Sequence, residues 1–150
     1  MKVVLSADTL DKGRCSRQWC IGHLGPGDTV VAVAGLPAFT GYVLGVPLVD
    51  QVETEHELLI QTDREYCEPI RATGAGCDAR IVPGGQARAV VDVARAEDAD
   101  LIVIAKRPHS RLGDAVWAEP ANRVVHHAPC PVVVVPAASR RTDAKVGVTR

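Results

Sequence analysis

Short apolar runs alternate with amphipathic stretches along this chain. Five short segments rich in apolar residues predict strands; they cover residues 2–7, 29–34, 77–82, 101–105 and 132–135. The runs VVAVA, LIVIA and VVVV are nearly continuous, which is typical of strands buried on both faces. Between them, apolar residues at helical spacing predict helices over residues 11–24, 52–73, 86–97 and 114–127. Pro69 is expected to end or kink the second of these helices.

This alternation of strands and helices predicts βαβ units. Such units require a parallel sheet with helices on both faces, and right-handed crossovers make the fold a single-domain, doubly wound open α/β sheet. A ligand of such a sheet binds outside the carboxyl ends of the strands. Three segments are expected to meet there: Asp8–Thr9, Gly35 and residues 106–113. The glycines and prolines of residues 35–47 favour a mobile, lid-like loop.

Composition narrows the class of protein. The 150 residues are 47% hydrophobic, 23% charged and only 3% aromatic, so Val, Ala, Leu and Ile must build the core of an ordinary globular domain. A formal net charge of −1 argues against a nucleic-acid or membrane partner. The apolar runs are too short for a membrane span or a signal peptide, which favours the cytoplasm. Residues 137–150 lack periodicity and are expected to form a flexible tail after a domain of residues 1–136.

The cysteines are odd in number and contain no CxxC pair; they are Cys15, Cys20, Cys67, Cys77 and Cys130. Free thiols in a reducing compartment account for them, and a redox role for Cys15 or Cys20 is the alternative. No spacing indicates a metal site. His109 is a candidate proton-transfer group, but no Ser, Cys or Asp is placed as its partner, so no catalytic residue is predicted.

Several segments carry a resemblance to a known family. The pattern ADLIVIAKR, then a helix, then HHAPCPVVVVP resembles the carboxyl-terminal half of the universal stress protein family. The segments KVVLSAD and GDTVVAVAGL resemble its first two strands more loosely, and GGQARAVVDVARAEDAD resembles its third helix. The resemblance implies five parallel strands in the order 3-2-1-4-5. It also implies a homodimer through the last strand, which here holds Val132, Val133, Val134 and Val135.

The phosphate-binding loop of that family is altered in this chain. ATP-binding members carry a glycine, two residues, a second glycine, nine residues and then Gly-Ser or Gly-Thr; the corresponding residues here are Ala105, Pro108, Ala118 and Glu119. Glycine lets the backbone approach a phosphate and present its N–H groups, whereas Pro108 has no N–H to offer. The Glu119 carboxylate would repel nearby phosphates by about 1–4 kcal/mol. The chain is therefore expected not to bind ATP in the usual way.

One position does match the family. In ATP-binding relatives, an aspartate at the end of the first strand contacts the nucleoside, and Asp8 occupies the corresponding position here. Alternatively, Asp8 only caps the turn that follows the strand. The predicted nucleotide or anion pocket consists of Asp8, Thr9, Gly35, Arg107 and Arg111. The basic loop can bind an anion without glycines, or it can be an ordinary solvated loop.

These features favour a non-enzymatic dimer that supports stress adaptation through a protein partner or a small ligand and needs no cofactor. A second hypothesis is a protein that binds ATP or another nucleotide through Asp8 and the basic loop from Lys106 to Arg111. A third hypothesis is an enzyme or thiol-redox protein on the same fold, which requires a cysteine of lowered pKa.

Overall fold

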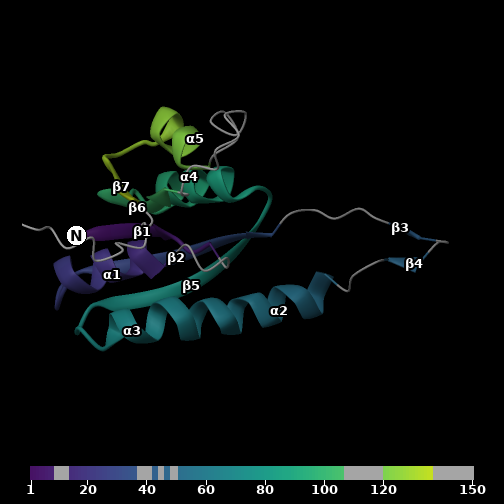
Figure 1. The fold of residues 1–150 in the computed structure, drawn as a ribbon, viewed down its shortest axis with the longest axis horizontal. Helices are drawn as coiled ribbons and strands as arrows, with labels where there is room; N and C mark the ends of the chain where they lie inside the picture. Colours follow the sequence, from purple (N-terminus) through teal and green to yellow (C-terminus); the bar gives the residue numbers. More distant parts are fainter. Residues whose placement is uncertain (9–13, 37–41, 44–45, 48–50, 107–119, 137–150) are drawn as a thin grey trace, which may run out of the picture.

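The sheet is the centre of the fold. The computed structural model describes residues 1–8, 14–36, 42–43, 46–47, 51–106 and 120–136. Five parallel strands form the sheet: β1 (Lys2–Ser6), β2 (Thr29–Leu36), β5 (Gly76–Pro83), β6 (Leu101–Lys106) and β7 (Val132–Pro136). Their order is β5-β2-β1-β6-β7 (Figure 1). Counted among these five strands alone, this is the order 3-2-1-4-5, so the predicted fold class is confirmed.

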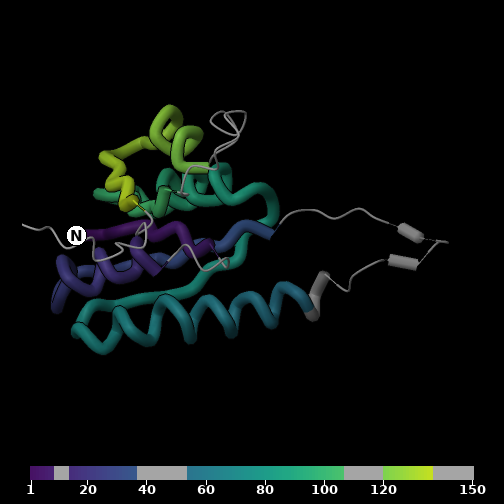
Figure 2. Tube along the Cα trace, viewed as in Figure 1, coloured from purple at the N-terminus to yellow at the C-terminus, as the bar shows by residue number. Residues whose placement is uncertain are grey.

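Helices cover both faces of the sheet (Figures 1 and 2). One face carries α1 (Arg14–His23), α2 (Gln51–Thr62), the π-helix η1 (Asp63–Cys67) and α3 (Glu68–Arg71). The other face carries α4 (Gln86–Ala96) and α5 (Pro120–His127). None of the helices in the described ranges is long and apolar enough to cross a membrane.

Two cores lie on the two faces of the sheet because successive strand residues point in opposite directions. Val3 and Leu5 of β1 pack in one buried cluster with residues of α1, η1 and α3. Val4, between them, packs in a second cluster with residues of α4 and α5. All three side chains are fully buried, and each contributes about 1.5–3 kcal/mol by its removal from water.

Residues 35–47 do not form one continuous loop, which corrects the prediction. β2 continues through Gly35 to Leu36, and the segment also holds a short antiparallel pair, β3 (Tyr42–Val43) and β4 (Val46–Pro47). Glycine favours turns, but it also fits inside a strand where another backbone comes close. Residues 37–41 and 44–45, and with them the expected lid, lie outside the described residues.

The helix expected over residues 52–73 is divided into three parts. It passes from α2 into the π-helix η1 and then into α3, which has Pro69 in its first turn. Pro69 has no N–H with which to bond the Glu65 carbonyl, and that carbonyl instead accepts a hydrogen bond from Arg17 Nη1 at 2.6 Å. The helical segment continues past Pro69 to Arg71, so the proline does not end it at this point. The expected starts of the first and last helices, at residues 11 and 114, and the tail 137–150 lie outside the described residues.

Candidate ligand site at the carboxyl edge of the sheet

Asp8 lies directly after β1, at the edge where a ligand is expected. Its backbone carbonyl accepts a hydrogen bond of 2.6 Å from Tyr66 Oη. Tyr66 belongs to η1 and is only 4% exposed. Burial, together with the charges of Asp8 and Glu65, raises the pKa of the Tyr66 phenol, so this group stays a neutral donor. The π-helix thus fixes the backbone at Asp8 from one face of the sheet.

Gly35 lies near the end of β2 and is in close contact with the start of α4. A Cβ atom at this position would come within 2.8 Å of the Gly84 carbonyl oxygen and 2.9 Å of Gln86 Cα. The backbone N–H of Gly35 donates a hydrogen bond of 2.6 Å to Gln86 Oε1. The absence of a side chain is therefore required for packing, and the N–H is bonded within the protein.

Gln86, the first residue of α4, joins the ends of the neighbouring strands β1 and β2. Besides accepting from Gly35, its side chain donates from Nε2 to Ser6 Oγ at 2.9 Å and to the Val33 carbonyl at 2.8 Å. Ser6 is 3% exposed, and the Val33 carbonyl also accepts from the Ala7 N–H at 2.9 Å. We refer to these contacts of one side chain with β1 and β2 as the Gln86 bridge. Gln86 is not among the site residues predicted from the sequence, although a polar residue directly after Gly84–Gly85 at the carboxyl edge is a usable signal.

Lys106 ends β6, the strand beside β1. The last β1–β6 pair in register is Leu5 with Val103, and Asp8 and Lys106 each follow that pair by three residues. The structure therefore brings Asp8, Gly35 and Lys106 to the same edge of the sheet. Of the other predicted site residues, Thr9, Arg107 and Arg111 lie outside the described residues, as do His109, Pro108, Ala118 and Glu119.

The cysteines are all free, as the sequence predicts. Burial raises the pKa of the Cys20 thiol to about 12. A hydrogen bond with the Cys77 thiol, assisted by burial, raises the pKa of Cys67, and burial also raises that of Cys130. These shifts favour the unreactive thiol over the thiolate at three of the five positions. In the ranges that the structure describes, no three His, Cys, Asp or Glu side chains are grouped to hold a metal ion.

Comparisons with known proteins agree with this fold. A sequence model described as the universal stress protein family matches residues 20–136. The chain is 30% identical over 90 residues to the universal stress protein Sll1388 of Synechocystis, covering 57% of this chain and 58% of that protein. It is 32% identical over 93 residues to a universal stress protein of Thermus aquaticus, covering 61% of this chain and 66% of that protein. The match thus spans less than two thirds of either relative.

Solved structures show the same architecture. The universal stress protein UspA from Lactobacillus plantarum superposes with a TM-score of 0.67 at 20% identity, covering 89% of this chain and 97% of the other. A universal stress protein solved in complex with cAMP superposes with a TM-score of 0.66 at 17% identity, covering 92% of this chain and 98% of the other. At such identities the likeness establishes the fold alone.

Proposed function

Because this chain belongs to the universal stress protein family, we propose that it is a non-enzymatic binding protein that supports stress adaptation through a protein partner or a small ligand. It does not hold ATP through the usual glycine loop and requires no cofactor. The observation that carries the statement about ATP is the replacement of the loop glycines by Ala105, Pro108 and Ala118. The Gln86 bridge supports it at the end of the neighbouring strand, since it uses the Gly35 N–H inside the protein.

The chemistry of the described carboxyl edge also favours binding over catalysis. Ser6 carries the hydroxyl within the Gln86 bridge, and its oxygen is bonded by an amide that cannot act as a general base. The thiols of Cys20 and Cys67 are buried, and their raised pKa values oppose nucleophilic attack. Five free thiols support a reducing compartment such as the cytoplasm.

A homodimer through β7 is the second part of the proposal. β7 is an edge strand of the described sheet, and an uncovered apolar edge strand favours pairing with another chain. Val132, Val133 and Val135 are half-buried, whereas Val134 is 37% exposed. Val125 of α5, a helix that packs against β7, is also exposed.

The test is to denature the gently purified protein, identify any released small molecules by mass spectrometry, and titrate the folded protein with ATP by calorimetry. We expect no released nucleotide and a flat titration. A released nucleotide, or saturable ATP binding, would overturn the proposal. A Gly-containing relative that binds ATP serves as the positive control for the calorimetry.

A second candidate function is nucleotide binding of another geometry, through Asp8 and the basic loop that begins at Lys106. The placement of Asp8 and Lys106 at the ends of neighbouring strands favours it, and so does the relative solved with cAMP. This candidate requires weak, salt-sensitive affinity for ATP that is lost in Asp8→Asn or Arg107→Gln but kept in Arg64→Gln, a change of an exposed arginine on η1. Absence of binding at millimolar ATP excludes it.

A further inference from the structure

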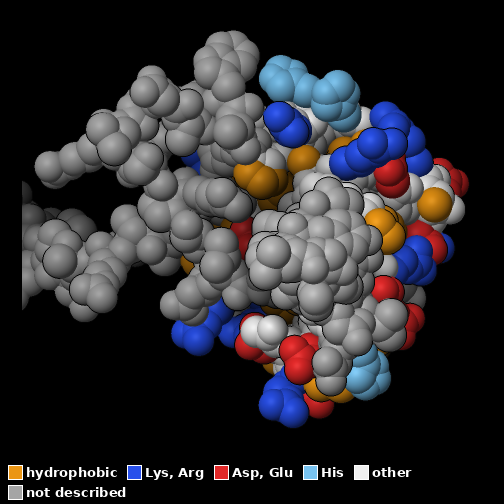
Figure 3. Space-filling view, turned by 90° about the vertical axis from the view of Figure 1, so that its right-hand side faces the viewer, with side chains coloured by type: hydrophobic (Ala, Val, Ile, Leu, Met, Phe, Trp, Pro, Cys, Tyr) orange, Lys and Arg blue, Asp and Glu red, His pale blue; other side chains and the backbone are white. Residues whose placement is uncertain are grey.

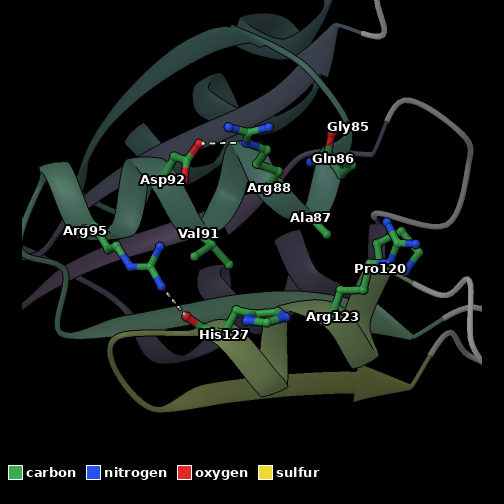
Figure 4. Close-up of a pocket in the computed structure, with 10 residues that line it drawn as sticks. All are labelled: Gly85, Gln86, Ala87, Arg88, Val91, Asp92, Arg95, Pro120, Arg123 and His127. Atoms are coloured by element: carbon green, nitrogen blue, oxygen red, sulfur yellow. Dashed lines mark hydrogen bonds and ion pairs between the residues drawn. The ribbon is translucent and has the colours of Figure 1, made fainter.

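A groove lies between α4 and α5, and its lining begins at Gly85 and Gln86 near the carboxyl edge. Its volume is about 650 Å³. Its lining includes Arg88, Asp92 and Arg95 of α4 and Arg123 and His127 of α5. In Figure 4, Arg95 extends toward α5, whereas the paired Arg88 and Asp92 side chains extend from the other side of α4. In Figure 3, Lys/Arg and His side chains gather along the upper edge of the molecule, where Figure 1 places α4 and α5. We call this feature the α4–α5 groove.

The charge of the α4–α5 groove is predominantly positive. Three arginines line it against a single carboxylate, that of Asp92. Arg88 Nε lies 3.6 Å from Asp92 Oδ2, but the Arg88 side chain is 85% exposed, so this pair neutralises it only weakly. Arg123 has no hydrogen-bond or ion-pair partner among the described residues. At least two guanidinium groups thus remain to attract an anion.

One of the arginines is held in place by the opposite helix. Arg95 Nη2 donates a hydrogen bond of 3.1 Å to the carbonyl of His127, the last residue of α5 (Figure 4). A guanidinium carries five N–H donors, so this bond leaves others for a ligand. It also joins α4 directly to the end of α5 across the groove. This contact orients the Arg95 guanidinium toward the groove.

The length of the groove indicates the shape of its ligand. Arg88 and Arg95 are seven residues apart on α4, which corresponds to about 10 Å along the helix axis. The two guanidinium groups also lie on different sides of α4 (Figure 4), so in this arrangement one phosphate or carboxylate does not contact both. An extended peptide of about 3.3 Å per residue spans the distance with three or four residues. Apolar side chains, those of Ala87, Val91 and Pro120, also line the groove. They suit a peptide with small apolar side chains better than an inorganic polyanion.

We propose that the α4–α5 groove binds an acidic peptide segment of a partner protein, with its carboxylates on Arg88, Arg95 and Arg123 and its apolar side chains on Val91 and Pro120. This inference rests on the proposed function as a binding protein and assigns the class of partner. Residues 137–150 of this chain are not the ligand, because they carry four basic residues and one acidic residue. Charge of the same sign would keep them from the groove.

The experiment is a fluorescence anisotropy titration of the full chain with a labelled peptide of about six residues in which Glu alternates with Ala, a length that covers the arginines. We expect saturable binding that weakens with added salt. Each single change, Arg88→Gln, Arg95→Gln or Arg123→Gln, should weaken binding by about two- to fivefold, and the triple variant by more than about tenfold. Arg64→Gln, which removes an exposed arginine from the opposite face, should have no effect.

Several outcomes would overturn the inference. It fails if the peptide does not bind, if Arg64→Gln weakens binding as much as Arg123→Gln, or if inorganic tripolyphosphate binds at the three arginines while the peptide does not. Equal binding of a peptide with Gln in place of Glu would also contradict it. Circular dichroism confirms that each variant is folded. The ATP titration on the same preparation separates the two proposals, since a flat ATP titration without peptide binding refutes only the assignment of the groove.

Discussion

Replacement of Gly35 by alanine tests whether this glycine serves packing. The new Cβ would lie 2.8 Å from the Gly84 carbonyl oxygen and 2.9 Å from the backbone nitrogen of Gln86. Both neighbours are backbone atoms at the start of α4, so relief requires a shift of the helix and not of a flexible side chain. Overpacking of this kind costs about 1–3 kcal/mol. Any shift also strains the 2.6 Å hydrogen bond from Gly35 to Gln86, which contributes about 0.5–1.5 kcal/mol.

The expected result for Gly35→Ala is a loss of about 2–4 kcal/mol in the free energy of unfolding, measured by urea denaturation. At about 2–4 °C per kcal/mol for a domain of this size, the melting temperature should fall by roughly 4–16 °C. Gly22→Ala is the matched control, because a Cβ at Gly22 of α1 meets nothing within 4 Å. That change should stabilise the protein by about 0.5–1 kcal/mol, as alanine does within a helix. Equal stability of Gly35→Ala and the unchanged protein would refute the packing argument.

Three further predictions concern assembly, acid stability and thiol reactivity. Val134→Lys should give a folded monomer by light scattering, because Val134 is 37% exposed; an unchanged dimer would exclude β7 as the interface. Arg71 lowers the pKa of Asp63 through a 2.6 Å hydrogen bond. This pair therefore stabilises the fold at pH values above the pKa of an aspartate in the unfolded chain, about 4. That stability is lost as the pH falls through the lowered pKa of Asp63 in the folded protein. Asp63→Asn should therefore reduce the dependence of the unfolding free energy on pH below about 4, and an unchanged slope would contradict this. Alkylation of native Cys20 and Cys67 should be far slower than in the denatured chain, since both are buried; rapid native labelling of either would restore a redox role.

Much of the fold follows from the sequence because parallel strands are buried on both faces. The valines of β1 and β2 and the run from Leu101 to Ala105 leave no polar face, and a sheet between two helical layers accommodates them. Strand positions are therefore well predicted. The extension of β2 past Gly35 was missed, because local turn preference and tight packing against another backbone both select glycine.

The candidate site was less accessible to sequence analysis because it depends on contacts between distant residues. Tyr66 is 58 residues from Asp8, and Gln86 is 80 residues from Ser6. A Tyr in a helix and a Gln at the start of another look like ordinary helical residues when only their neighbours in the chain are considered. Their roles arise only when the crossovers bring both helices against the end of β1.

Together, the contacts at the end of β1 oppose the recognition of a phosphate by the Gly35 backbone N–H. Tyr66 bonds the Asp8 carbonyl from one face of the sheet, and the Gln86 bridge holds Ser6 and Gly35 from the other. A ligand that needed the Gly35 N–H would first have to break a 2.6 Å bond and leave the Gln86 oxygen without its donor, at a cost of about 1–3 kcal/mol. Under the proposed function, recognition at this edge would fall to side chains beyond the bridge, with Asp8 and Lys106 as the described candidates. A site of that kind would select its ligand by charge and shape, so the acidic and basic groups of the ligand would matter more than a phosphate chain.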